Sequence, residues 1–160
     1  MQSIDLIRDN LTKSSERVLA HVDDMRTFAL TTPTSTGGCH TLWVLGHLAY
    51  IESLVVESFM LGRKNPLAHW EKIFDGDDPS GDADDYPPFH EVLATCRAVR
   101  QSTVSLLDSL SEEDLNKTSA QAPAGWEETF GTYRLCLQYA ADHWYMHRGH
   151  LADARRAARQ

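Results

Sequence analysis

Four long stretches of this sequence carry apolar residues at steps of three and four, and that spacing limits the fold more than any other feature. The stretches span residues 2–28, 39–61, 87–110 and 129–159. In the first, the repeat runs through Ile4, Ile7, Leu11, Val18, Val22 and Met25. Such a repeat places apolar side chains on one face of an α-helix. No alternating pattern typical of strands competes with it, so the sequence predicts an all-α fold, a four-helix bundle.

The connections between these stretches differ in length. The longest, residues 62–88, is rich in Asp, Gly and Pro and has no periodicity, so we expect a long crossover loop between the second and third helices. We interpret it as a solvated acidic segment, with a functional lid as the alternative. Its Asp run lacks the spacing of an EF-hand, which argues against calcium. Residues 111–115, SEEDL, are typical of a Ser-capped helical turn, and residues 117–128 of a loop.

Length and charge narrow the class of protein. The chain has 160 residues and a formal net charge of −8, which predicts one domain over residues 1–160 and disfavours nucleic acid as a partner. The three cysteines, Cys39, Cys96 and Cys136, lie far apart and are odd in number, so a disulfide framework is not expected. That pattern, and a start without a charged leader and apolar run, favour a cytoplasmic location. We find no apolar stretch of about 20 residues and therefore expect no membrane span.

Two of the eight histidines lie four residues apart in the last predicted helix. His143 and His147 therefore share one helix face, and that face is the apolar one. Burying two imidazoles without partners costs free energy, and a shared metal ion removes that cost. The alternative is a metal-free bundle in which both are ordinary core histidines bonded to backbone or water.

A third histidine, His47, lies mid-way along the second predicted helix among apolar residues. It follows Gly46, which permits close approach of another backbone. Three neutral imidazoles leave a metal ion an open coordination position, the mark of a catalytic site. His40 lies seven residues earlier and is a weaker candidate, while His150 is expected at the rim or behind the ligands. The remaining histidines, His21, His69 and His90, are expected at the surface or in caps.

In these histidine-containing segments and in its helix order, the chain resembles the DinB-like superfamily. The likeness rests on TLWVLGHLAYIE at 41–52 and HWYMHRGHL at 143–151, together with the helix order and SEEDL before the final helix. The resemblance implies a four-helix bundle, usually a homodimer, with a divalent metal ion on His47, His143 and His147. Where the family often has Gln after HRG, this chain has His150. Zinc or nickel is expected first, with iron or manganese as alternatives.

Some members of the family that the chain resembles are transferases or isomerases that use a low-molecular-weight thiol such as bacillithiol or mycothiol. Three neutral ligands leave the charge of a divalent ion uncompensated, which suits activation of a thiol or of water. We therefore expect a metal-dependent thiol transferase or isomerase, with a small-molecule substrate. The alternatives are a metal-dependent hydrolase and a non-enzymatic metal-binding or stress-related module.

No general base is evident near these histidines in the sequence. Glu52 lies five residues past His47, nearly on its far flank, and is expected to form a salt bridge. Trp43 could line a pocket beside His47, but we favour core packing for Trp43 and Trp144.

Overall fold

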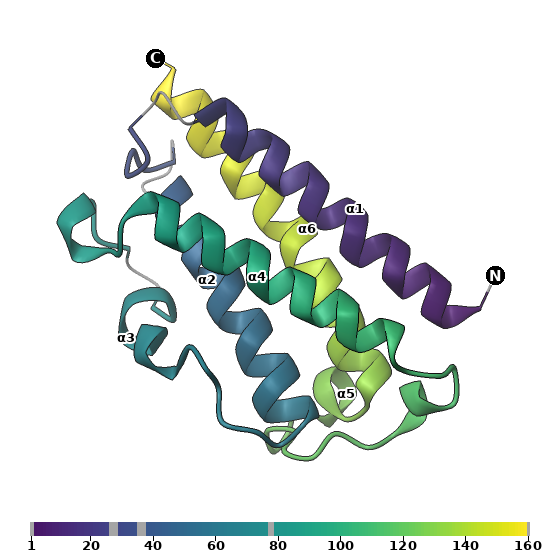
Figure 1. Ribbon diagram of the computed structural model, residues 1–160. Coiled ribbons are helices and arrows are strands. Elements are labelled where there is room, and N and C mark those ends of the chain that lie inside the picture. The colour runs from purple at the N-terminus through teal and green to yellow at the C-terminus, as the bar shows by residue number, and fades with distance from the viewer. Residues whose placement is uncertain (1, 26–28, 35–37, 77–78, 160) are drawn as a thin grey trace.

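Long helices make up most of the protein. The computed structural model describes residues 2–25, 29–34, 38–76 and 79–159. Its long helical segments lie side by side (Figure 1), and their bounds are α1 (Ser3–Met25), α2 (Thr41–Ser53), α4 (Phe89–Asp108) and α6 (Tyr133–Ala158). The π-helix η1 (Leu54–Met60) continues directly from α2. Among the described residues the only β-type pairing is the isolated bridge Thr118–Thr132, so the all-α prediction is confirmed.

The connection between η1 and α4 differs from the expected loop. It contains η2 (Ala68–Trp70), α3 (Glu71–Phe74) and η3 (Ala83–Asp85). These elements are three or four residues long, which is too short to produce a readable period in the sequence. Trp70 and Phe74 are both buried, with ring centroids 4.9 Å apart, and they join the core around α2. Part of the acidic connection is therefore structural rather than a solvated loop.

The expected start of the last helix also changes. The last helix begins at Tyr133 rather than at residue 129, because the hydroxyl of Thr132 accepts a bond from the Leu135 N–H at 3.3 Å and caps it. The residues just before it form the separate short helix α5 (Glu127–Phe130). The first helix is described as far as Met25, and the expected continuation to residue 28 lies outside the described residues. The SEEDL turn is confirmed as η4 (Asp114–Asn116), with the Ser111 hydroxyl accepting from the Asp114 N–H at 3.2 Å.

The helix directions explain why the second connection is long. Arg155 of α6 pairs with Asp24 of α1 at 2.5 Å, and Arg17 lies over the ring of Tyr145, so α1 and α6 run the same way. Arg8 pairs with Asp108 at 2.7 Å, so α4 runs opposite to α1. Figure 1 shows α2 and α4 running in the same direction, which requires a connection that returns across the full length of a helix.

Helix α2 forms the centre of the molecule. It packs against both α4 and α6, and nearly all of its residues are buried. By length and composition, Thr41–Met60 is long and apolar enough to cross a membrane, contrary to our expectation that no such stretch exists. However, 67% of its most apolar window is buried inside the protein, which is typical of a core helix.

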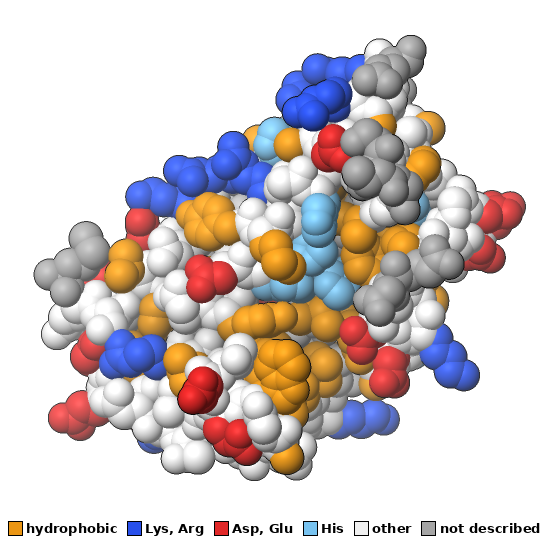
Figure 2. Space-filling view, turned by 180° about the vertical axis from the view of Figure 1, so that it is seen from behind, with side chains coloured by type: hydrophobic (Ala, Val, Ile, Leu, Met, Phe, Trp, Pro, Cys, Tyr) orange, Lys and Arg blue, Asp and Glu red, His pale blue; other side chains and the backbone are white. Residues whose placement is uncertain are grey.

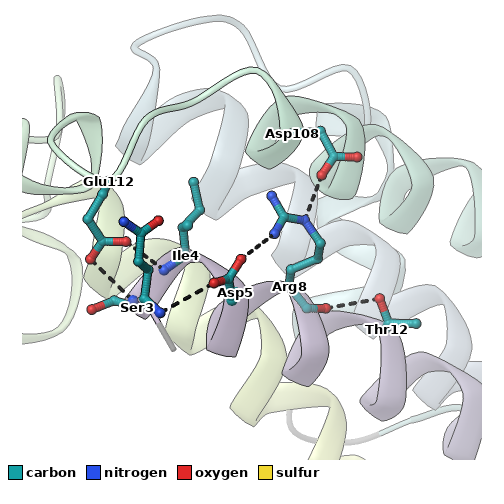
Figure 3. A network of polar contacts seen from close by, with 8 residues as sticks. Ser3, Ile4, Asp5, Arg8, Thr12, Asp108 and Glu112 are labelled. Atoms are coloured by element: carbon teal, nitrogen blue, oxygen red, sulfur yellow. Dashed lines mark hydrogen bonds and ion pairs between the residues drawn. The ribbon is translucent and has the colours of Figure 1, made fainter.

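A carboxylate from a distant segment caps the start of α1. Glu112 accepts hydrogen bonds from the backbone N–H groups of Ser3 and Ile4, at 3.2 and 2.9 Å (Figure 3). These amides have no partner within the helix, and a negative charge there also favours the helix dipole. The same bonds hold the pKa of the Glu112 carboxyl below its usual value. The turn before η4 is thereby tied to the first turn of α1.

Candidate metal centre

Three histidines from two helices meet at one point between α2 and α6. The Nε2 atoms of His47 and His143 are 3.2 Å apart. One ring nitrogen from each of His47, His143 and His147 lies within 4.8 Å of those of the other two. His143 and His147 are four residues apart on α6, and they remain only 6% and 4% exposed. The structure therefore brings together the three histidines that the sequence singled out.

The orientation of His47 is set by the crossover connection. Its Nδ1–H donates to the backbone carbonyl of Phe74 at 2.6 Å, and because a carbonyl can only accept, the lone pair of His47 is left on Nε2. Gly46 makes this contact possible, because a Cβ there would lie 2.0 Å from the Phe74 ring. The sequence had suggested that Gly46 admits another backbone. It admits an aromatic ring instead, and the carbonyl that follows the ring reaches His47.

Aromatic rings enclose the three imidazoles. Trp43 stacks on His47 with ring centroids 4.4 Å apart, and Tyr139 stacks on His143 at 5.4 Å. Trp43 is 4% exposed, so it both packs in the core and forms a wall of the site. These flat faces restrict rotation of the imidazoles and exclude water from their sides. Tyr139 was not identified from the sequence, although its position four residues before His143 places it on the same helix face.

Burial keeps the three imidazoles neutral. It lowers the pKa of His47, and burial with the neighbouring histidines lowers the pKa of His143 to about 3 and that of His147 to about 2. A protonated imidazole cannot bind a metal ion, since its lone pair is occupied. All three side chains are therefore in the protonation state that a metal ligand requires at neutral pH.

The arrangement fits a divalent metal ion. Imidazole nitrogens bind zinc at about 2.0–2.1 Å, which in tetrahedral geometry sets neighbouring donors about 3.3 Å apart. The observed separation of 3.2 Å between the Nε2 atoms of His47 and His143 agrees with that value, whereas the three donor atoms as a set lie within 4.8 Å of one another. Two lone pairs this close repel each other unless a proton or a cation lies between them. Neutral nitrogen donors suit zinc, nickel and iron better than calcium or magnesium.

The site opens to the surface on one side. Figure 2 shows histidine side chains gathered in the middle of one face, bordered by hydrophobic side chains. His47 is half-buried, and His150, whose ring centroid lies 4.9 Å from that of His147, is exposed. Histidine side chains therefore reach solvent on this face, next to apolar side chains.

The other histidines have different roles. His40 caps α2, with its Nδ1 accepting from the Trp43 N–H at 3.1 Å and its Nε2–H donating to the Ser80 carbonyl at 2.7 Å. Both ring nitrogens are thereby used, which excludes His40 from the ligand set in this arrangement. His69 and His90 are exposed, as expected, and His21 is half-buried in a cleft with Tyr145 and Arg148.

A second buried polar cluster lies beyond the histidines. The Glu52 carboxylate pairs with Arg100 at 2.8 Å and accepts from the Trp144 indole N–H at 2.6 Å. Arg100 also donates to the backbone carbonyls of Leu11 and Ala140, both at 3.0 Å. The expectation that Glu52 forms a salt bridge is confirmed, and its partner comes from α4. This carboxylate is thus committed to a cation and does not act as a base at the histidines.

Comparison with known proteins agrees with this fold. A crystal structure of a conserved protein from Enterococcus faecalis is similar, with a TM-score of 0.69 and 22% sequence identity over 99% of this chain and 98% of that one. No curated protein matched the sequence. The profile of the DinB superfamily matches residues 10–151, a range that includes all three clustered histidines. The chain therefore belongs to the DinB superfamily.

Proposed function

We propose that this protein binds one divalent metal ion, zinc or nickel, through His47, His143 and His147 and uses it to activate a low-molecular-weight thiol for transfer to a small electrophilic substrate. The observation that carries the proposal is the convergence of three neutral imidazoles, a group that includes no carboxylate among the described residues. When bound, an ion with only neutral protein ligands keeps its full charge and lowers the pKa of a thiol or water that reaches it.

The chain supplies no thiol of its own to the site. Cys96 and Cys136 are fully buried in the two core clusters, and Cys39 packs against the first of them. Burial raises the pKa values of the Cys96 and Cys136 thiols, which makes both poor nucleophiles. A reacting thiol must therefore come from solution, across the open side of the site.

The residues around the histidines support binding and orientation rather than proton transfer. Trp43 and Tyr139 fix the ring planes, and the Phe74 carbonyl holds the proton of His47 on Nδ1. The apolar rim in Figure 2 favours a substrate with an apolar part. In the transfer itself, the thiol loses its proton to solvent, its sulfur forms a bond to an electrophilic carbon, and the leaving group departs with the electron pair of the broken bond.

The test is a thiol-transfer assay with protein loaded with zinc or nickel. Bacillithiol, mycothiol, cysteine and glutathione are each supplied with an electrophile that bears a halide leaving group, and the thioether product is measured by mass spectrometry. We expect a rate above that of free metal alone, lost in His143→Ala and kept in His90→Ala, whose histidine is exposed and outside the site. No acceleration with any thiol would contradict the proposal. Thiol-independent ester cleavage would favour the hydrolase alternative.

A further inference from the structure

His150 lies against His147, whereas the backbone fixes the tautomer of His47 alone among the clustered histidines, through the Phe74 carbonyl. His150 follows His147 by three residues on α6, and the two Nδ1 atoms are 3.1 Å apart. At that distance one nitrogen must carry a proton and the other must accept it, because two lone pairs or two N–H groups would repel. The contact therefore decides which nitrogen of His147 is available to a ligand.

The two possible arrangements have opposite consequences. If the His150 Nδ1–H donates, the remaining proton of a neutral His147 is on Nε2, and that nitrogen cannot bind a cation. If the His147 Nδ1–H donates, the lone pair of His147 is on Nε2. His47 is already held in this second form by the Phe74 carbonyl. The partner of His47 is a carbonyl, which can only accept a hydrogen bond. The partner of His147 is a second imidazole, which can donate or accept one.

We propose that His150 is a positioning residue for the metal centre, accepting the Nδ1–H of His147 so that the Nε2 lone pair of His147 joins those of His47 and His143. The inference rests on the proposed metal function and adds to it a residue outside the ligand set. Because His150 is exposed, it performs this role at the rim of the site, and its loss leaves no cavity in the core. Partners of this kind typically contribute 10–100-fold to metal affinity, by order of magnitude.

The test compares two substitutions at one position. His150→Ala removes the acceptor, whereas His150→Gln supplies a side-chain carbonyl that can accept the same proton. The control is Met146→Ala, which truncates another exposed side chain of α6 next to His147. The dissociation constant for zinc is measured by competition with a chelator. In the zinc-loaded proteins, long-range ¹H–¹⁵N NMR reads which nitrogen of His147 carries the proton.

We expect His150→Ala to bind zinc about 10–100-fold more weakly, and His150→Gln to recover most of the affinity with the proton of His147 on Nδ1. Met146→Ala should bind as the wild type does. Equal affinity in His150→Ala and wild type would overturn this inference alone. Equal weakness of both variants, with a changed visible spectrum of the cobalt-substituted protein, would overturn it by making His150 a fourth ligand. A wild type that binds no ion would overturn the proposed function as well.

Discussion

Two buried polar clusters both involve α2 and α6, and they differ in charge balance. Glu52, Arg100 and Trp144 form a cluster in which a carboxylate faces a guanidinium and an indole N–H. His47, His143 and His147 form a cluster of three neutral bases whose nitrogens converge. The first cluster contains its own cation, and the second contains none. We infer that the first serves the fold and the second serves a ligand.

The helix geometry separates the two clusters although their residues are close in sequence. His143 and Trp144 are neighbours on α6, and successive residues on a helix point about 100° apart. Glu52 follows His47 by five residues and likewise lies on another side of α2. Helices α2 and α6 can therefore carry a candidate metal centre on one side and, on another, contribute Glu52 and Trp144 to the structural cluster around Arg100 of α4.

The largest effect should come from breaking the ion pair. Arg100→Ala leaves the Glu52 carboxylate buried at 1% exposure without its cation, and we expect a loss of about 3–5 kcal/mol in the free energy of unfolding. Urea denaturation of the variant and the wild type measures this difference in the free energy of unfolding. The variant should still bind metal wherever it remains folded, because no clustered histidine bonds to Arg100.

The matched control for that variant is Arg8→Ala, which removes an exposed ion pair with Asp108 and should cost no more than about 1 kcal/mol. Equal losses in the two variants would contradict the distinction between a buried structural pair and a surface pair.

The second prediction concerns pH in the metal-free protein. His143 and His147 have pKa values of about 3 and 2 when folded, against an ordinary value of 6.5. Below about pH 6.5 the unfolded chain takes up protons that the folded chain does not, so stability falls as pH is lowered. Each histidine contributes up to about 1.4 kcal/mol per pH unit in that window.

This slope is measured by urea denaturation of chelator-treated protein between pH 7 and pH 4. The double variant His143→Ala/His147→Ala should show a shallower slope than the wild type. Parallel slopes would mean that the two imidazoles are not held neutral by the fold.

The third prediction compares the same change, Gly to Ala, at two separate positions. Gly46→Ala places a Cβ 2.0 Å from the ring of Phe74, which is fully buried beside Trp70 and Tyr86. We expect a loss of about 1–3 kcal/mol and weaker zinc binding, since the Phe74 carbonyl that orients His47 must move.

Gly149→Ala, on the exposed side of α6 with nothing within 4 Å, should instead stabilise the protein by about 0.5–1 kcal/mol. Thermal denaturation and zinc titration distinguish the two substitutions. Weaker zinc binding in Gly149→Ala as well would contradict the specific role of the contact between Gly46 and Phe74.

The long helices and their buried faces could be predicted from the sequence, because long helices repeat their apolar residues over many turns. The same periodicity placed His143 and His147 on one inward face, and it placed Glu52 away from His47. The short elements of the crossover could not be predicted, since four residues such as Glu71–Phe74 contain barely one helical turn. The bond from His47 to the Phe74 carbonyl could not be predicted for a different reason. Every residue has a backbone carbonyl, so the sequence does not indicate which of them accepts a hydrogen bond. In the sequence, only Gly46 indicated that another segment approaches α2 closely.

Position on a helix alone also misleads about individual histidines. His40 and His47 are two turns apart on nearly the same face. However, His40 precedes the first residue of α2, and its side chain caps that helix instead of facing the other histidines. His150 was expected at the rim or behind the ligands, and the structure places it at both, exposed and in contact with His147. The homodimer expected from the family resemblance stays a prediction.

The most direct test of the account is elemental analysis of purified protein, with wild type beside His47→Ala, His147→Ala and the exposed-site control His90→Ala. We predict about one divalent ion per chain in the wild type and in His90→Ala, and none in the other two variants. Absence of metal from the wild type after incubation with zinc or nickel, or retention of metal by His147→Ala, would contradict the claim that these three histidines form a metal centre.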